Sequence, residues 1–236
     1  MSKEKELFLH NRTVIEERIR QAASRVGREH EDIQIVAVSK TKPAQMVLQA
    51  YDAGFRLFGE NKVQEMLEKQ ESAYCKNLEI EWHLIGHLQT NKVRQVIGKA
   101  ALIHSVDRMN LAYEIQKCAE KKNIISNILI QVNVGREDTK SGFYLEETWE
   151  AVDLISKLHN IRIHGLMTIA PFRLNPEENR KLFRELYEIY IDINREKKDN
   201  VIMSILSMGM SNDFEVAVEE GANMVRIGTA VFGERI

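Results

Sequence analysis

Short apolar runs alternate with amphipathic segments along almost the whole chain. The first run, Ile-Gln-Ile-Val-Ala-Val at residues 33–38, is apolar on both faces, which is typical of a buried parallel strand. Similar strands are predicted at residues 55–59, 80–86, 101–106, 127–134, 161–167, 201–207 and 224–228. Helical spacing predicts an amphipathic helix at residues 4–26 and further helices at residues 43–53, 60–69, 91–97, 108–122, 145–158, 176–197 and 213–220. Asp107 is expected to cap the helix that follows it.

This regular alternation predicts an α/β fold with parallel strands and right-handed crossovers. Eight strand–helix units in 236 residues favour a single (β/α)8 TIM-type barrel with an extra N-terminal helix. The alternative is an open doubly wound sheet, which is expected to carry an early nucleotide-binding turn. No G-x-G-x-x-G follows the first strand, and no Walker lysine loop occurs. Since no linker or shift in composition divides the chain, residues 1–236 are expected to form one domain.

Charge and composition exclude several classes of partner. The formal net charge is −2, which argues against nucleic acid or another strong polyelectrolyte. No apolar run approaches the roughly 20 residues that span a bilayer, and the charged N-terminus lacks a signal region. Cys75 and Cys118 stand far apart, as in proteins of a reducing compartment. We therefore expect a cytoplasmic protein that binds neither nucleic acid nor membrane.

Histidine spacing gives no sign of a metal site. His83 and His87 are four residues apart, but they lie in a predicted strand and turn rather than on one helix face, so no metal ligand is predicted. His104 and His164 lie within predicted strands and are expected to be hydrogen-bonded residues of the core.

Lys40 is the first candidate for chemistry. It follows the buried strand at residues 33–38, and Pro43 then fits the first turn of a helix. The carboxyl ends of parallel barrel strands usually carry the active site. Partial burial there would lower the pKa of a lysine and leave its amine available for a Schiff base. The alternative is an ordinary solvated loop lysine.

The ends of the last two predicted strands resemble an anion pocket. Ser207-Met-Gly209-Met-Ser211 and Arg226-Ile-Gly228-Thr229 both place small residues just before a turn. Backbone N–H groups at such turns can hold a phosphate, and the loops after strands 7 and 8 are a frequent phosphate site in barrels. The alternative is that the glycines only permit tight turns. With a lysine after the first strand, a phosphate pocket suggests pyridoxal phosphate.

Arg226 lies inside the last predicted strand, on the same face as Gly228. A charged side chain within a barrel strand is costly unless it meets a partner. That partner is either a ring nitrogen of a bound cofactor, which would accept a hydrogen bond, or a buried acidic side chain.

Six blocks of sequence resemble the pyridoxal phosphate homeostasis protein family. They appear in the family's order, cover the chain almost from end to end, and are Val-Ser-Lys-Thr-Lys-Pro at residues 38–43, Phe-Gly-Glu-Asn at 58–61, Trp-His-Leu-Ile-Gly-His-Leu-Gln-Thr-Asn-Lys at 82–92, His-Gly-Leu-Met at 164–167, Ser-Met-Gly-Met-Ser-Asn-Asp at 207–213 and Arg-Ile-Gly-Thr-Ala-Val-Phe-Gly at 226–233. The blocks at 82–92 and 207–213 are the most specific. The resemblance implies a barrel like the N-terminal domain of alanine racemase.

The resemblance also implies a set of cofactor-binding residues. Pyridoxal 5'-phosphate would be covalently bound to Lys40 as a Schiff base. Its phosphate would contact Ser207, Gly209, Gly228 and Thr229, and Arg226 would face the pyridine nitrogen. The residues expected to line the pocket or lie close to it are Asn61, Met167 and His83.

Members of this family bind and buffer the cofactor, affect amino-acid and keto-acid balance, and have no established catalytic turnover, so no catalytic residue is predicted. Apo enzymes that depend on the cofactor are expected as recipients. Racemases carry a further β-domain through which they partly dimerise; the few residues after the last predicted strand leave no room for it, so a monomer is expected. The alternatives are a small pyridoxal phosphate-dependent amino-acid racemase or lyase, and a barrel that binds another phosphorylated metabolite without a covalent bond.

Overall fold

All of the strands expected from the apolar runs are present in the computed structural model, which describes residues 3–233. They close in chain order into a parallel barrel, in which the last strand pairs with the first. The strands are β1 (Gln34–Val38), β2 (Leu57–Glu60), β3 (Glu81–Leu84), β4 (Leu102–Val106), β5 (Ser126–Val132), β6 (Ile161–Thr168), β7 (Val201–Met210) and β8 (Met224–Ile227). The predicted (β/α)8 barrel is confirmed. The predicted domain of residues 1–236 includes residues 1–2 and 234–236, which lie outside the described residues.

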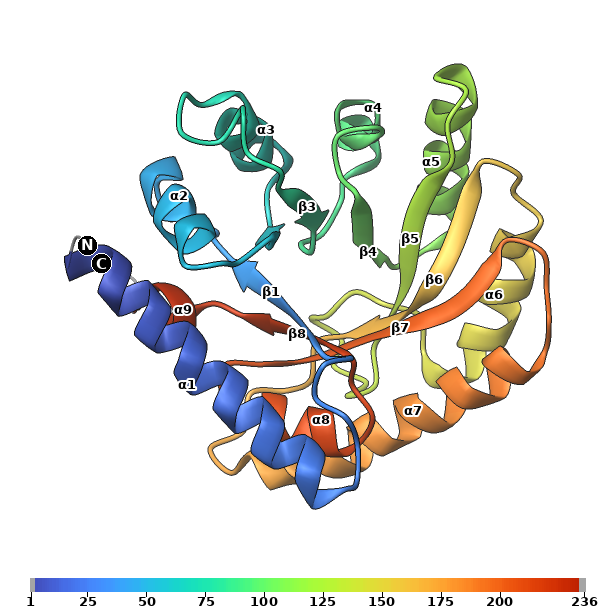
Figure 1. Ribbon diagram of the computed structural model, residues 1–236. Helices are drawn as coiled ribbons and strands as arrows, with labels where there is room; N and C mark the ends of the chain where they lie inside the picture. The colour runs from blue at the N-terminus through green and yellow to red at the C-terminus, as the bar shows by residue number, and fades with distance from the viewer. Residues whose placement is uncertain (1–2, 234–236) are drawn as a thin grey trace.

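Helices surround the strands, as Figure 1 shows. They are α1 (Lys3–Arg25), α2 (Ala44–Asp52), α3 (Val63–Glu71), α4 (Val93–Val96), α5 (Met109–Lys121), α6 (Thr148–Ser156), α7 (Arg180–Arg195), α8 (Phe214–Glu219) and α9 (Thr229–Phe232), with 3-10 turns at Thr90–Lys92, Leu145–Glu147 and Pro176–Asn179. The extra helix α1 lies beside α8 and α9 (Figure 1). Asn11 Nδ2 donates to Val231 O (3.0 Å), and Arg18 forms an ion pair with Glu215, so α1 joins the start of the fold to its end.

The strands are apolar on both faces because each face packs against a different core. The small core inside the barrel contains Val36, Leu102, Leu129, Met167 and Met224. The larger core lies between the strands and the helices and includes Ala37, Phe58 and Ile103, which alternate with inward-facing positions. This arrangement explains the near-continuous apolar runs from which the barrel was predicted.

Strand β7 runs on to Met210, whereas the sequence pattern ended it at Ser207. Ser207 pairs with Met224, and Met210 pairs with Arg226, so β7 has one more residue than β8 between these pairs. This is a β-bulge, and Gly209 within it has φ +89°, which a residue with a side chain rarely adopts. Gly209, which was expected to form a turn after the strand, therefore lies within β7, which continues and bends at this position.

Two other local features differ from the sequence expectation. Asp107 does not cap α5, because its carboxylate accepts hydrogen bonds from His87 and Arg108 instead; the predicted cap was wrong. The short helix α9 was not predicted. No helix within residues 3–233 is long and apolar enough to cross a membrane.

Candidate functional site

Lys40 lies just beyond the carboxyl end of β1 and is half-buried. The Ser39 N–H donates to Gly59 O (3.1 Å), so the hydrogen-bond ladder between β1 and β2 continues past the end of β1. Side chains alternate along an extended chain, and Val36 packs inside the barrel. Lys40 has the same parity as Val36 and therefore belongs to the face that leads into the barrel mouth.

A buried ion pair lies behind this lysine, on the outer side of the barrel wall. Glu60 Oε1 accepts hydrogen bonds from Ser39 Oγ (2.6 Å) and from Lys69 Nζ (2.5 Å). Lys69 also donates to Ser39 O (2.7 Å), so both the side chain and the carbonyl of Ser39 are held. Burial raises the pKa of Glu60, and the ammonium of Lys69 opposes that shift. The pair thus fixes the residue directly before Lys40.

Thr41, directly after Lys40, is held by the same network. Its φ of +65° is unusual for a β-branched residue and carries strain. Its N–H donates to Glu65 Oε1, which also accepts from Lys69 Nζ (2.9 Å). Helix α3 therefore holds both neighbours of Lys40. Sequence reasoning did not assign this role. Glu60 could have been noticed as a carboxylate ending a buried strand, but Lys69 resembles any other charged residue of an amphipathic helix.

The bulge of β7 contributes Gly209 to the mouth. A Cβ atom there would lie 2.6 Å from Ala217 Cβ and 2.8 Å from Phe214 Cα, so α8 packs directly against the glycine. Asp213 stabilises the turn that follows, because its Oδ1 accepts from the Met210 N–H (2.8 Å). Gly209 is thus required by the chain's own packing and backbone conformation.

Gly228 differs from Gly209, because nothing in the chain requires a glycine at this position. Its φ is −105°, and a Cβ atom would meet only Val38, at an ordinary contact distance of 3.6 Å. Its N–H donates to Ser211 Oγ (3.2 Å), which connects the turn after β7 with the turn after β8. Ser211 was not predicted as a site residue. Gly228 is half-buried and has room for one added methyl group beside Val38, at the carboxyl end of β1.

Arg226 lies inside the barrel and is almost fully buried. It donates to Ser207 O (2.9 Å), Ser207 Oγ (2.7 Å) and Thr168 O (2.6 Å), which uses three of its five N–H groups. Burial lowers the pKa of Arg226 to about 10, with Asp213 opposing the shift, so the guanidinium stays charged at neutral pH. The sequence alternative of an ion pair is not what these contacts show, since carbonyl and hydroxyl oxygens accept its hydrogen bonds.

His83 and His104 face each other inside the barrel, and the distance from His104 Nε2 to His83 Nδ1 is 3.0 Å. His104 Nδ1 lies 3.2 Å from Ser207 Oγ. Burial lowers the pKa of His83 to about 4 and that of His104 well below its ordinary value. Both rings are therefore neutral at physiological pH, and the prediction that His104 is a hydrogen-bonded core residue is confirmed. His164 is also hydrogen-bonded, to Asn127 Oδ1, but is only partly buried.

Lowering the pH from about 7 to about 5 is expected to destabilise the fold through these histidines. The unfolded chain takes up a proton on each imidazole near pH 6.5, whereas folded His83 resists protonation until about pH 4. The stability is therefore present above the unfolded pKa and lost as the pH falls, by up to about 1.4 kcal/mol per pH unit for each histidine. Urea unfolding at several pH values should show a shallower pH dependence for His83→Gln than for the wild type. The exposed control His159→Gln should keep the wild-type dependence; equal slopes for all three proteins would contradict the assignment.

The remaining predicted residues lie around the same mouth. Asn61 follows β2 and is half-buried, and its backbone packs so closely on Gly86 that a Cβ there would lie 2.3 Å from Asn61 O. Met167, on β6, is fully buried inside the barrel. Thr229, the first residue of α9, is exposed next to Gly228. The structure brings the predicted residues together at and just below the carboxyl ends of the strands.

His87 and Asp107 form a further polar pair at this end of the barrel. His87 Nδ1 donates to Asp107 Oδ2 (2.9 Å), and the carboxylate is buried while the ring is half-exposed. The ring lines a small pocket of about 140 Å³ together with Gln131, Asn133 and Lys140. Among residues 3–233, no group of three or more acidic, histidine or cysteine side chains could hold a metal ion.

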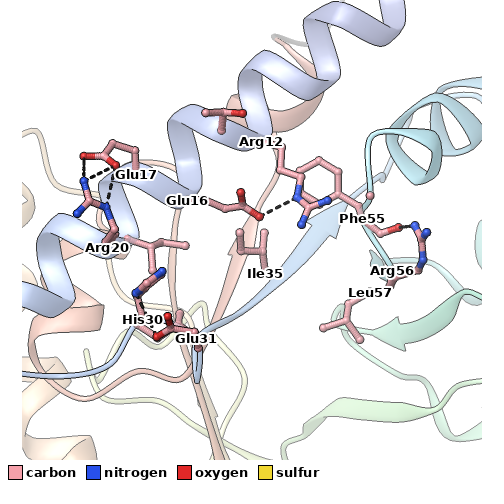
Figure 2. Close-up of a pocket in the computed structure, with 14 residues that line it drawn as sticks. Arg12, Glu16, Glu17, Arg20, His30, Glu31, Ile35, Phe55, Arg56 and Leu57 are labelled. Atoms are coloured by element: carbon pink, nitrogen blue, oxygen red, sulfur yellow. Dashed lines mark hydrogen bonds and ion pairs between the residues drawn. The ribbon is translucent and has the colours of Figure 1, made fainter.

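A larger hollow, of about 570 Å³, lies at the opposite end of the barrel, between α1 and the amino ends of β1 and β2. Figure 2 shows its charged residues in neighbouring pairs: Arg12 with Glu16, Arg20 with Glu17, and His30 with Glu31. Arg56 also lines the hollow, and its guanidinium donates to the carbonyls of Tyr51 and Phe55. The hollow is remote from Lys40 and is not part of the candidate site.

The residues of the mouth fit pyridoxal phosphate. Lys40 supplies an amine at the mouth, and Gly228 leaves a small cradle beside Val38 that a single Cβ would fill. Ser211 and the first N–H groups of α9 border that cradle, and helix N-termini leave such groups without an intrahelical acceptor. Arg226 still has N–H groups that its bonds to Ser207 and Thr168 do not use.

The fold and the mouth define a class of protein, namely a (β/α)8 barrel with a lysine after the first strand and glycine-containing turns at the ends of the last two. The family model described as "Alanine racemase, N-terminal domain" matches residues 11–236. A curated relative named "Pyridoxal phosphate homeostasis protein", from Aquifex aeolicus, is 50% identical over 219 residues, which are 93% of this chain and 94% of the relative.

Two solved structures are also similar. A protein from Bifidobacterium adolescentis, titled as unknown, is 31% identical with a TM-score of 0.91, and the match covers 98% of this chain and 97% of that one. PipY of Synechococcus elongatus PCC7942, with PLP bound, is 34% identical with a TM-score of 0.78, and the match covers 91% of this chain and 100% of PipY. The chain belongs to the alanine racemase N-terminal domain family and, within it, to the pyridoxal phosphate homeostasis proteins, which confirms the resemblance found in its sequence.

Proposed function

We propose that this protein binds pyridoxal 5'-phosphate in the barrel mouth and acts in the homeostasis of that cofactor. The observation that carries this proposal is the combination around one opening of a lysine whose two neighbours in sequence are held, a glycine with room for one added methyl group, and a buried guanidinium. The curated relative that carries this role in its name, and the PipY structure with PLP bound, support it. The protein buffers or carries the cofactor within the cytoplasm and thereby affects amino-acid and keto-acid balance.

Each predicted residue has a place in this proposal. Lys40 bonds covalently to the cofactor as a Schiff base. The phosphate is held at the turns of Gly209, Gly228 and Thr229, and Arg226 donates to the pyridine nitrogen. The residues that line or border the pocket are Asn61, Met167 and His83. Ser207 was predicted to contact the phosphate, and its position in the barrel interior is considered further below.

The charge on Arg226 favours holding the cofactor over catalysis. When bound, the cofactor supplies an electron sink that is strongest when its ring nitrogen is protonated. Since Arg226 is still charged at neutral pH, it presents a hydrogen-bond donor that disfavours that protonation. The ring is then a weaker electron sink, so we propose a non-catalytic protein in which no residue has a catalytic role.

Adding pyridoxal phosphate to the purified protein is expected to produce a visible absorbance band, and Gly228→Ala is expected to weaken this binding at least about tenfold. The added methyl group occupies the cradle, where the phosphate would lie. The free energy of unfolding should change by less than about 0.5 kcal/mol, because φ is ordinary and the nearest contact is 3.6 Å away. Absorbance titration and urea unfolding measure the two effects. Unchanged affinity in a folded variant would remove the phosphate from this turn, and a wild type that stays colourless would refute the proposed function.

The alternative function, a small racemase or lyase, is tested with the same preparation. Incubation of the loaded protein with L-alanine and other amino acids should give no sustained conversion, as followed by chiral chromatography. Turnover that persists in the wild type and disappears in Lys40→Ala would make the protein an enzyme. Light scattering tests the proposed monomeric state, and limited proteolysis tests the single domain over residues 1–236. Reactivation of an apo enzyme tests the proposed transfer of cofactor.

A further inference from the structure

Four side chains cross the barrel interior in one continuous series of hydrogen bonds, from Arg226 on β8 through Ser207 on β7 and His104 on β4 to His83 on β3. We call this series the Arg226–His83 chain and infer that each of its hydrogen bonds is donated in the same direction, from Arg226 toward His83. Ser207, His104 and His83 are then positioning residues that hold Arg226. Ser207 then does not contact the phosphate. The inference rests on the proposed function only for what Arg226 faces; the direction of the chain is independent of any ligand.

The first two links follow from the chemistry of the guanidinium. Arginine only donates hydrogen bonds, so Ser207 Oγ is the acceptor in its 2.7 Å contact with Arg226 Nη1. The proton of the Ser207 hydroxyl remains to be donated. The other contact of this oxygen is His104 Nδ1, at 3.2 Å. His104 Nδ1 is therefore an acceptor and carries no proton.

The next links follow from the burial of the two rings. His104 is completely buried and neutral, so its single ring proton is on Nε2, which lies 3.0 Å from His83 Nδ1. His83 accepts at Nδ1 and, being neutral as well, has its proton on Nε2. That nitrogen lies 4.0 Å from Glu81 Oε2, an exposed carboxylate, so the proton points toward negative charge.

The opposite direction leaves two groups poorly matched. If His104 Nδ1 carried the proton, it would donate to Ser207, and the hydroxyl proton would have no acceptor among the contacts of the described residues. His83 Nε2 would then carry no proton, and its lone pair would face the carboxylate of Glu81. Buried polar groups are nearly always satisfied, so the structure favours the direction away from Arg226.

This direction has a consequence for Ser207. Its hydroxyl accepts from Arg226 and donates to His104, so its proton is already used and it cannot donate to a phosphate. Its carbonyl accepts from the same guanidinium (2.9 Å). Ser207 therefore fixes the angle of Arg226 from two atoms, while the two histidines fix the rotation of its hydroxyl.

Nuclear magnetic resonance of protein labelled with nitrogen-15 histidine, prepared without cofactor, tests the direction. Two-bond proton–nitrogen spectra distinguish the two neutral tautomers from the imidazolium. Both His83 and His104, assigned by the loss of their signals in His83→Gln and His104→Gln, are expected as neutral Nε2–H tautomers between about pH 6 and 8. An Nδ1–H tautomer or an imidazolium at either residue of the wild type would overturn the inference.

Ser207→Ala tests whether the hydrogen bonds of the Arg226–His83 chain are connected. It is expected to shift the resonances of His104 and, through it, those of His83. The matched control is Ser105→Ala. Ser105 lies on β4, is fully buried like Ser207, and donates its hydroxyl proton to Gly86 O, which is not part of the Arg226–His83 chain, so its loss should leave both rings unchanged. A Ser207→Ala protein in which His83 does not respond would contradict a connected chain.

The role of Ser207 is tested by comparing pyridoxal phosphate with pyridoxal, which lacks the phosphate. As a positioning residue, Ser207 acts through Arg226 on the ring, so Ser207→Ala should weaken both ligands by a similar factor, about tenfold. A loss confined to pyridoxal phosphate would show that Ser207 contacts the phosphate and would overturn this part of the inference. If neither ligand binds to the wild type, the proposed function fails, whereas the tautomers still decide the direction of the chain.

Discussion

Replacing Lys40 with alanine is expected to abolish covalent attachment of pyridoxal phosphate, whereas replacing Lys42 is expected to leave it intact. The hydrogen-bond ladder between β1 and β2 continues to Ser39 and leads Lys40 to the barrel mouth. Lys42 lies beyond the turn at Thr41 (φ +65°) and lines a hollow beside α3 on the outer side of the barrel wall. Lys42 is half-buried, as Lys40 is, which makes Lys42→Ala a matched control for the loss of a positive charge.

The measurement is reduction with borohydride followed by peptide mass mapping. The wild type and Lys42→Ala should carry a reduced pyridoxyl group on Lys40, and Lys40→Ala should carry none there and lose its visible band. The turn should persist in Lys40→Ala, because Ser39 and Thr41 are held through their own atoms. An adduct of undiminished yield on another lysine of Lys40→Ala would place the site elsewhere.

Replacing Lys69 with methionine is expected to cost about 3–5 kcal/mol of unfolding free energy, the largest loss of stability that we predict for a single charged residue here. Methionine keeps most of the volume but leaves Glu60 as a buried carboxylate without its ammonium partner. It also leaves the carbonyl of Ser39 without its donor. Since these groups hold the residue before Lys40, affinity for the cofactor should fall as well.

The pH dependence of this loss has a definite sign. Burial already raises the pKa of Glu60 above its ordinary value, and Lys69 is the main group that lowers it. Without Lys69 the folded-state pKa rises further. A carboxyl group with a raised folded pKa contributes stability below its unfolded pKa and loses it as the pH rises through the folded pKa. Relative to the wild type, Lys69→Met should therefore lose markedly more stability at about pH 8 than at about pH 5.

Urea unfolding at both pH values checks this prediction. The double variant Lys69→Met/Glu60→Gln removes the buried charge and should recover part of the stability and lose the steep pH dependence. Lys62→Met, an exposed lysine just before α3, is the control and should behave like the wild type. If Lys69→Met is as stable as Lys62→Met, the ion pair does not support the turn that carries Lys40.

The barrel could be predicted from sequence because its strands are buried on both faces, so each one appears as a short, nearly continuous apolar run. Lys40 could be found because a charge ends the first of these runs abruptly. The glycines after β7 and β8 also stood out, but their different roles did not. Only the backbone angle of Gly209 and the absence of a close contact for an added Cβ at Gly228 distinguish a packing requirement from a candidate ligand cradle.

Contacts between distant, common residue types could not be predicted in this way. Lys69 meets Ser39 across two elements, and His104 meets Ser207 across the barrel, with no local pattern that marks either contact. The wrong prediction of a cap at Asp107 has the same origin. Local sequence predicts that its carboxylate caps α5, whereas His87 and Arg108 donate to that carboxylate instead.

The pairing of β8 with β1 places Gly228 beside Val38, although these residues come from opposite ends of the chain. Contacts between residues so far apart in sequence form slowly, because the entropy cost of closing a large loop precedes the stabilisation that the contacts provide. The lysine and the glycine cradle therefore meet only when the last strand docks and the ring of strands is complete. We therefore expect retention of pyridoxal phosphate at the proposed site to report closure of the barrel, so that a chain still emerging from the ribosome should not bind the cofactor there.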